Sequence, residues 1–174
     1  MSIKKIITIP DPLLRKISQP VKSVDKEIKK LAEDMLETMY KAPGIGLAAV
    51  QIGILKRVIV IDISKKDEKK NPLFIINPQL TFKSDELVSY EEGCLSIPSQ
   101  FAEVKRPNKC NVNYLDIEGN KKEIQAEGLL ATCIQHEIDH LNGILFIDYL
   151  SKLKKDLIIK KVKKQKKEID KVIV

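Results

Sequence analysis

The 174-residue sequence is poor in several residue types, and each shortage narrows the class of protein that it can encode. It has no tryptophan, two histidines and three cysteines. Three cysteines, an odd number without a close pairing pattern, argue against a secreted disulfide framework and indicate a reducing compartment. No apolar run approaches the roughly 20 residues that a membrane-spanning helix needs. Pro10 and Pro12 interrupt the apolar start too early for a signal peptide. We therefore expect a cytoplasmic protein without a membrane segment.

The net charge of +7 lies entirely at one end of the chain. Residues 1–150 hold 21 Lys and Arg against 21 Asp and Glu, whereas residues 151–174 hold 10 Lys against 3 acidic residues. The length suits one domain with a real core, so we expect residues 1–174 to form a single domain that ends in a basic helix or tail over 151–174. A solvated helix face explains the lysine run 160–167 most simply, and attraction to nucleic acid is the alternative.

Hydrophobic periodicity predicts the order of helices and strands. A first amphipathic helix is expected over residues 25–41, capped by Ser23 or Asp25. Runs typical of strands follow at 57–63, 73–82 with an interruption at Pro78, 87–90, 102–106 and 110–115. A turn at 118–120 leads into a further strand over 121–126, which predicts antiparallel pairing.

Two more helices complete the expected fold. One spans residues 128–142 and is apolar around nearly its whole circumference, so it should be central. The other runs from residue 150 to about 167. Its residues expected to face inward are Leu153, Leu157, Ile158 and Val162. The prediction is an α+β fold with antiparallel or mixed sheets wrapped around the central helix.

The central helix carries both histidines of the chain, His136 and His140. Residues four apart share one helix face, so the two imidazoles can bind one metal ion, and Glu137 beside them is placed to handle water. The pattern His-Glu-x-x-His also occurs on solvated helices. Unpaired imidazoles and carboxylates in so apolar a helix would cost several kcal/mol, and a bound metal removes that conflict. The motif therefore favours metal-assisted hydrolysis of a carbonyl compound. Asp139 is interpreted as a buried partner, for example of Arg106, that holds the helix in place.

A catalytic site of this kind needs a third protein ligand and an open position. The metalloprotease pattern with a third histidine further along is excluded, because Phe146 occupies that position. The glutamate after the motif is Glu168, in the lysine-rich tail, which makes it a poor candidate. Asp148 and Asp156 stay open, although they follow no recognised pattern.

The cysteines offer another candidate for the third ligand. Cys94 lies in the polar, glycine-bearing segment 91–98 after a predicted strand, where a turn can aim its thiolate inward. A thiolate with two imidazoles is a plausible set for zinc or iron(II). Cys110 and Cys133 are more readily explained as residues that fill core space.

A glycine-rich segment lies between residues 44 and 51. Its Gly-x-Gly-x-x-Ala pattern resembles a dinucleotide-binding fingerprint, but that fingerprint needs a strand before it, and here a helix and Pro43 precede it. We reject that interpretation. The paired glycines instead allow backbone to approach a ligand closely, and Gln51 offers an amide donor to a developing oxyanion.

Three segments together resemble the motifs of bacterial peptide deformylases. They are Gly44-Ile-Gly-Leu-Ala-Ala-Val-Gln51, Glu92-Gly-Cys-Leu-Ser96 and His136-Glu-Ile-Asp-His140, in this order. The resemblance implies an enzyme that removes the N-formyl group from the N-formylmethionine of nascent chains and releases formate. It also implies that Cys94, His136 and His140 hold a divalent metal, most commonly Fe²⁺, with Zn²⁺, Ni²⁺ or Co²⁺ as substitutes.

The resemblance further implies roles for the other motif residues. Glu137 would act as general base on the attacking water and then as acid toward the leaving amine. The side chain of Gln51 and the backbone N–H of Leu95 would stabilise the oxyanion. Gly46 and Ile45 would present backbone to an extended substrate. The candidates for the pocket that takes the methionine side chain are Ile45, Leu129 and Cys133, and the last two are equally well explained as core residues.

Two features bear on the partners of such an enzyme. Many relatives carry an arginine shortly after the cysteine motif that contacts substrate backbone, and the matching residue here is Phe101, so peptide preference is expected to differ. The C-terminal helix of the family docks on the ribosome, which offers the basic tail a partner in ribosomal RNA.

Two other functions compete with this interpretation. A general metallopeptidase that cleaves ordinary peptide bonds would have a third ligand other than Cys94 and a wider groove. A basic RNA-associated protein with a structural metal would normally need a fourth protein ligand, and the sequence has no further histidine to supply one.

Overall fold

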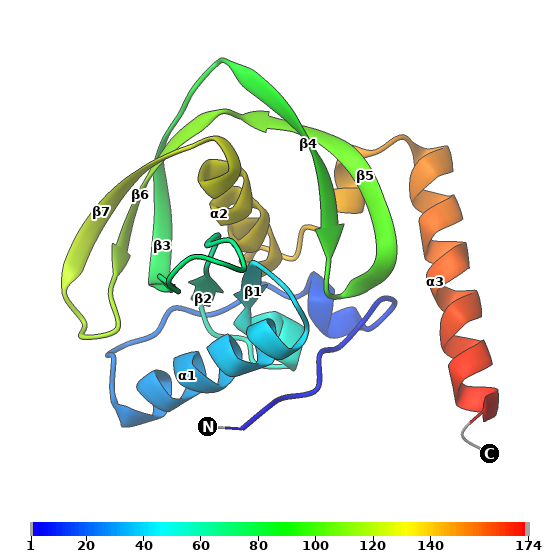
Figure 1. The fold of residues 1–174 in the computed structure, drawn as a ribbon, viewed down its shortest axis with the longest axis horizontal. Coiled ribbons are helices and arrows are strands. Elements are labelled where there is room, and N and C mark those ends of the chain that lie inside the picture. The colour runs from blue at the N-terminus through cyan, green and yellow to red at the C-terminus, as the bar shows by residue number, and fades with distance from the viewer. Residues whose placement is uncertain (1, 173–174) are drawn as a thin grey trace.

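The structure, a computed structural model that describes residues 2–172, is an α+β fold in which strands of two antiparallel sheets surround one helix (Figure 1). The helices are α1 (Lys26–Lys41), α2 (Gly128–Leu141) and α3 (Lys152–Val172), with short 3-10 helices at Pro12–Arg15, Ala49–Ile52 and Phe146–Tyr149. The strands are β1 (Gly46–Ala48), β2 (Val58–Ile61), β3 (Leu73–Lys83), β4 (Leu87–Cys94), β5 (Ile97–Pro107), β6 (Lys109–Leu115) and β7 (Lys121–Glu127).

The two sheets differ in size. Strands β1, β2, β3, β6 and β7 form the larger sheet in that spatial order, and β4 pairs with β5 in the smaller one. The hairpin between β6 and β7 turns at Asp116, whose Oδ1 accepts hydrogen bonds from the backbone N–H of Glu118 and of Asn120. Gly119 in this turn has a φ of 84°, which glycine adopts without strain. The predicted antiparallel hairpin is confirmed.

Helix α1 covers the larger sheet on one side, where it contacts β1 and β2. The Asp25 side chain accepts a hydrogen bond from the backbone N–H of Ile28 at 2.9 Å, so Asp25 rather than Ser23 is the N-cap. The apolar residues that the helix buries follow the predicted spacing and are Ile28, Leu31, Ala32, Met35 and Met39.

Helix α2 lies between the strands of both sheets, as predicted for the central helix (Figure 1). Ten of its fourteen residues are buried, and they include His136, Glu137 and His140. Since solvent reaches so little of α2, every polar side chain on it needs a partner inside the protein or a bound group.

Several predicted strand limits were wrong. The strand predicted over 57–63 is the shorter β2 because the Asp62 carboxylate accepts hydrogen bonds from the backbone N–H of Ser64 and of Asn71, which turns the chain there. Strand β3 continues through Pro78, but its pairing with β6 is interrupted there by a register shift between Ile76 and Gln79. The smaller sheet extends further than predicted, to Cys94 in β4 and back to Ile97 in β5.

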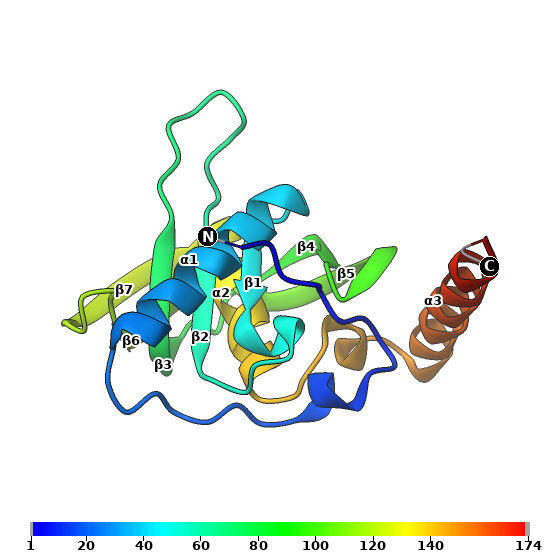
Figure 2. The same cartoon turned by 90° about the horizontal axis from the view of Figure 1, so that it is seen from below.

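The prediction of the buried face of the last helix was correct for two of its four residues. Ile158 and Val162 are buried, but Leu153 is 71% exposed and Leu157 49% exposed. Helix α3 packs mainly against β5 and the preceding 3-10 helix. It lies at the edge of the molecule in both ribbon views (Figures 1 and 2). Helix α3 packs on the rest of the protein through one narrow face, so the neighbouring face with Leu153 and Leu157 stays exposed to solvent.

Within residues 2–172, no helix combines the length and the apolar character that crossing a membrane requires.

Candidate active site

A cavity of about 450 Å³ lies where the two sheets meet α2. One wall is the segment from Ala42 to Gly46, and the other is β4 from Tyr90 to Cys94 with the turn that follows. Helix α2 supplies a further wall, with Leu129, Thr132 and one face of the histidine motif. Each of the three sequence motifs therefore contributes to the same cavity.

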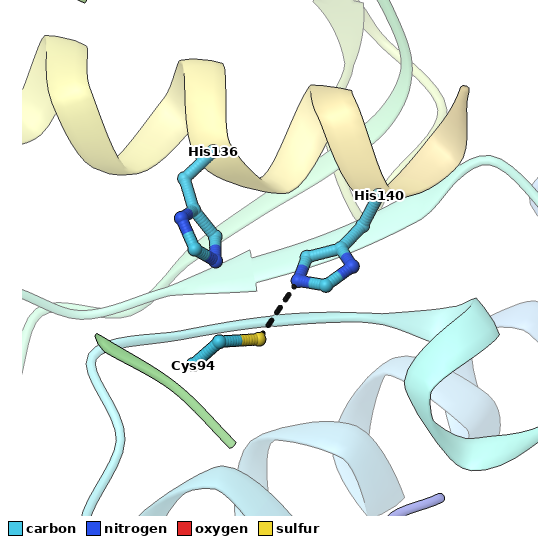
Figure 3. A group of neighbouring side chains, drawn as sticks. All are labelled: Cys94, His136 and His140. Carbon is cyan, nitrogen blue, oxygen red and sulfur yellow. Dashed lines mark hydrogen bonds between the residues drawn. The ribbon is translucent and has the colours of Figure 1, made fainter. Parts of the chain in front are cut away.

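Cys94, His136 and His140 converge in this region. The cysteine is the last residue of β4, and the two histidines project from α2 toward it (Figure 3). One ligand atom from each residue lies within 4.8 Å of the other two, and Cys94 Sγ lies 3.1 Å from His140 Nε2. Burial and the neighbouring His136 lower the pKa of His140, which favours the neutral ring that binds metals.

This donor set fits a divalent metal. One thiolate and two imidazoles are ligands for zinc or iron(II), and three protein ligands are the usual number at a catalytic site. Such a group would also account for two buried imidazoles and a half-buried thiol that meet although they come from two separate elements.

A buried chain of charged groups fixes the orientation of His136. His136 Nδ1 lies 2.8 Å from Glu92 Oε2, which leaves Nε2 for the site. Arg106 donates to both oxygens of Glu92, at 2.6 and 3.0 Å, and to Asp139 at 2.7 Å. Tyr149 donates to the same Asp139 oxygen at 2.8 Å and lies under the Arg106 guanidinium. The predicted pairing of Asp139 with Arg106 is confirmed.

Glu137 faces the cavity beside the metal-ligand candidates. Burial raises its pKa to about 7, an effect that the charge of His136 opposes and that of Glu92 reinforces. Its Oε2 is buried and has no hydrogen-bond partner among the described residues. A carboxylate of this kind is suited to accept and return a proton.

Gln51 is held with its amide nitrogen toward the site. Its Oε1 accepts a hydrogen bond from the backbone N–H of Ala48 at 2.8 Å, which leaves Nε2 to donate to Ser96 Oγ at 3.2 Å and to Cys94 Sγ at 3.5 Å. Leu95, which follows Cys94, also lines the cavity. A fixed amide donor beside the ligand cluster can stabilise negative charge that develops there.

The predicted pocket residues Ile45, Gly46, Leu129 and Cys133 all line the cavity. Ile45 and Leu129 are 44% and 41% exposed, so Leu129 is not a core residue. Cys133 is buried, which raises the pKa of its thiol, and it also belongs to a core cluster. A Cβ added at Gly46 would overlap Glu137 Oε1 and lie 2.9 Å from Cys133 Sγ, so only glycine fits there.

The sequence assigned no role to three further residues of the site. Glu92 and Ser96 flank Cys94 and hold His136 and Gln51, and Thr132 lines the cavity. The alternation of β4 is the signal that could have found Glu92, since residues two apart share one face of a strand. The two aspartates left open as third ligands, Asp148 and Asp156, lie elsewhere: Asp148 pairs with Arg15 and Lys155, and Asp156 lies in α3.

Comparisons with known proteins agree with this geometry. A family model described as polypeptide deformylase matches residues 3–156. A curated peptide deformylase from Pelagibacter ubique (strain HTCC1062) is 61% identical over 166 residues, covering 95% of this chain and 96% of the relative. One from Rhizobium meliloti (strain 1021) is 58% identical over 167 residues, with 96% of each covered. The crystal structure of peptide deformylase from Ehrlichia chaffeensis superposes with a TM-score of 0.92 at 46% identity, covering 96% of this chain and 98% of that one. A second crystal structure of that enzyme, in complex with actinonin, gives a TM-score of 0.91 at 48% identity over 95% of this chain and 98% of that one.

Proposed function

Since the chain belongs to the polypeptide deformylase family, we propose how its residues remove the formyl group from N-formylmethionyl peptides. The chain is a metal-dependent deformylase, and the alternative of a general metallopeptidase is not supported. The single observation that carries the residue assignments is the meeting of Cys94, His136 and His140 at the cavity that Glu137 also lines. We take residues 1–174 to act as one catalytic domain.

Cys94, His136 and His140 hold one divalent cation in this proposal, with Fe²⁺ as the physiological metal and Zn²⁺, Ni²⁺ or Co²⁺ as substitutes. A cation bound there supplies a Lewis acid that polarises the formyl carbonyl and makes water nucleophilic. Glu92 supports the assignment, because its contact with Nδ1 fixes the tautomer and the orientation of His136.

Glu137 is the general base and acid. It removes a proton from the attacking water as the new C–O bond forms at the formyl carbon. It then returns the proton to the methionine nitrogen as the C–N bond breaks, so that formate and a free amine leave. Its unpartnered, buried Oε2 at the cavity supports this assignment.

Gln51 and Leu95 stabilise the oxyanion that precedes C–N cleavage. The Gln51 Nε2 donor is already oriented by the backbone N–H of Ala48, so it needs little rearrangement during the reaction. The backbone N–H of Leu95 is the second donor. Gly46 and Ile45 present backbone to the extended peptide, and Ile45, Leu129 and Cys133 surround the methionine side chain.

Substitution of the base and of the thiolate ligand tests these roles. Glu137→Ala should retain the bound metal, counted after anaerobic preparation, and lose formate release from a formyl-Met tripeptide by about 10²- to 10⁴-fold. Cys94→Ala should lose the metal or change its identity. Turnover by Glu137→Ala equal to that of the unaltered chain would refute the assignment of the base.

A second proposal concerns the place of action. The excess of +7 lies in residues 151–174, and lysines crowd one side of α3 at positions 160, 163, 164 and 167. We propose that α3 binds ribosomal RNA in the cytoplasm, close to nascent chains. Deletion of residues 160–174 should weaken salt-sensitive co-sedimentation with ribosomes and leave tripeptide hydrolysis unchanged, whereas unchanged co-sedimentation would contradict this role.

A further inference from the structure

One wall of the catalytic cavity is a short segment that belongs to no helix or strand over most of its length. Residues 42–45 connect the end of α1 to β1, and the wall runs from Ala42 to Gly46. Strand β1 in turn pairs with β2, and both strands contact α1 (Figure 1). A loop keeps a defined binding geometry only when the surrounding scaffold fixes its ends.

A single hydrogen bond joins the two ends of this wall. Tyr40, in the last turn of α1, donates its hydroxyl hydrogen to Asp62 Oδ2. Asp62 directly follows β2, and its backbone N–H donates to the carbonyl oxygen of Ile45 at 2.9 Å. The helix that leads into the wall and the backbone of the wall itself are thus both attached to Asp62, which is buried.

The charges on the two side chains make this hydrogen bond a strong one. Burial alone would raise the pKa of Asp62, but hydrogen bonds from Ser64 and Tyr40 hold it below its usual value, so the carboxylate is ionised. Burial and the same carboxylate raise the pKa of Tyr40, so the hydroxyl keeps its proton. Hydrogen bonds to an ionised acceptor are roughly twice as strong as neutral ones. The Lys70 ammonium, 4.9 Å from the centre of the Tyr40 ring, adds a cation–π contact.

Asp62 is a fixed anchor for the tyrosine. Its Oδ1 accepts a hydrogen bond from the backbone N–H of Ser64 at 2.9 Å, and its Oδ2 accepts one from Asn71 at 3.2 Å. These two bonds explain the aspartate as a residue that turns the chain after β2. They do not require a tyrosine, so the hydrogen bond from Tyr40 calls for a further explanation.

We propose that Tyr40 and Asp62 are positioning residues that hold the backbone of Ile45 and Gly46 where it receives the formyl-Met peptide. The inference rests on the proposed function, in which these two residues present backbone to the peptide. Neither Tyr40 nor Asp62 lines the cavity, so both act through the wall and not on the substrate. A wall that is already ordered before the peptide arrives does not have to be ordered on binding, which lowers KM.

Comparison of two substrates tests this proposal. Formyl-Met-Ala-Ser carries peptide backbone beyond the methionine, and formyl-methioninamide lacks it. Tyr40→Phe keeps the ring and removes only the hydroxyl. It should raise KM for the tripeptide by about 3- to 10-fold, the range expected for one hydrogen bond, with kcat unchanged. The value of kcat/KM for formyl-methioninamide should stay the same, so the ratio of the two kcat/KM values falls. Taking the ratio within one preparation cancels any loss of folded or metal-loaded enzyme.

A second variant and a matched control accompany Tyr40→Phe. Asp62→Asn removes the charge of the acceptor and should lower the same ratio. The double variant should lower it no further than the more severe single variant, because the two residues act as one pair. Tyr114→Phe is the control: Tyr114 lies in β6 and does not line the cavity, so loss of its hydroxyl should leave the ratio unchanged.

The possible outcomes separate the inference from the proposed function. The inference fails, and the proposed function stands, if Tyr40→Phe hydrolyses both substrates with the ratio of the unaltered chain. It also fails if the loss falls on kcat and not on KM, or if the effects of the two substitutions add. If the unaltered, metal-loaded chain hydrolyses neither substrate, the proposed function itself fails.

Discussion

Replacement of Arg106 by methionine should destabilise the protein far more than loss of an ordinary ion pair. The Arg106 side chain is 3% exposed, and its partners Glu92 and Asp139 are 5% and 14% exposed. Arg106→Met keeps a similar apolar length but leaves two carboxylates without their cation. Removing one partner of a buried ion pair costs about 3–5 kcal/mol. For a chain of this size that corresponds to a fall in Tm of roughly 6–20 °C.

Denaturant unfolding with a chelator present is the appropriate assay, because a bound metal would add its own stabilisation. Arg15→Met is the matched control. Arg15 pairs with Asp148 on the surface, where its side chain is 40% exposed, so its loss should cost less than about 1 kcal/mol. The double variant Glu92→Gln, Arg106→Met should lose less than the sum of the two single variants, since the two residues act as a pair. A cost for Arg106→Met no greater than that of Arg15→Met, or strict additivity, would refute the reasoning.

Three further predictions follow from the same structure. Gly46→Ala places a methyl group against Glu137, so kcat/KM should fall by about 10²- to 10⁴-fold while metal content is retained; unchanged kinetics would show that the methyl group is tolerated. Burial would by itself raise the pKa of Asp34, but hydrogen bonds from the Ser2 backbone and the Lys30 side chain hold it well below its usual range. A carboxyl group whose pKa is lower in the folded than in the unfolded state stabilises the folded protein at pH values above the unfolded-state pKa, near 3.9. Asp34→Asn should therefore lower the free energy of unfolding by about 2 kcal/mol at pH 7, and by progressively less as the pH falls below about 4, as measured by chemical denaturation. A loss that does not change with pH would contradict this. Chelation should abolish formate release and lower Tm, and restoring a divalent metal should recover both; activity that survives complete removal would exclude a catalytic metal.

Local patterns predicted those parts of the site that lie within one element. The spacing of His136 and His140 and the apolar surface around them identified both the central helix and its polar face, because helical periodicity is a property of the sequence itself. The α1 cap at Asp25 follows from the same kind of local rule.

Contacts between distant segments were harder to predict. Cys94 reaches the histidines from another element. Its glycine-bearing segment made it one candidate among several, and the joint occurrence of three motifs singled it out. Glu92 received no role from the sequence, yet it is buried and contacts His136 and Arg106, which come from other elements. Strand β1 has three residues, too few to show any period. The exposure of Leu153 was missed because periodicity defines a helix face but not how much of that face the protein covers.

Because α3 packs on the protein through one narrow face, substitutions on its outward side and substitutions in the catalytic site are under separate evolutionary constraints. Leu153 and Leu157 on the outward side of this helix are largely exposed, so substitutions there leave the buried residues Ile158 and Val162 in place. Substitutions on this outer side can therefore change the surface of α3 while the catalytic residues stay intact. The same independence makes the outer surface of α3 a convenient place to attach a fluorophore.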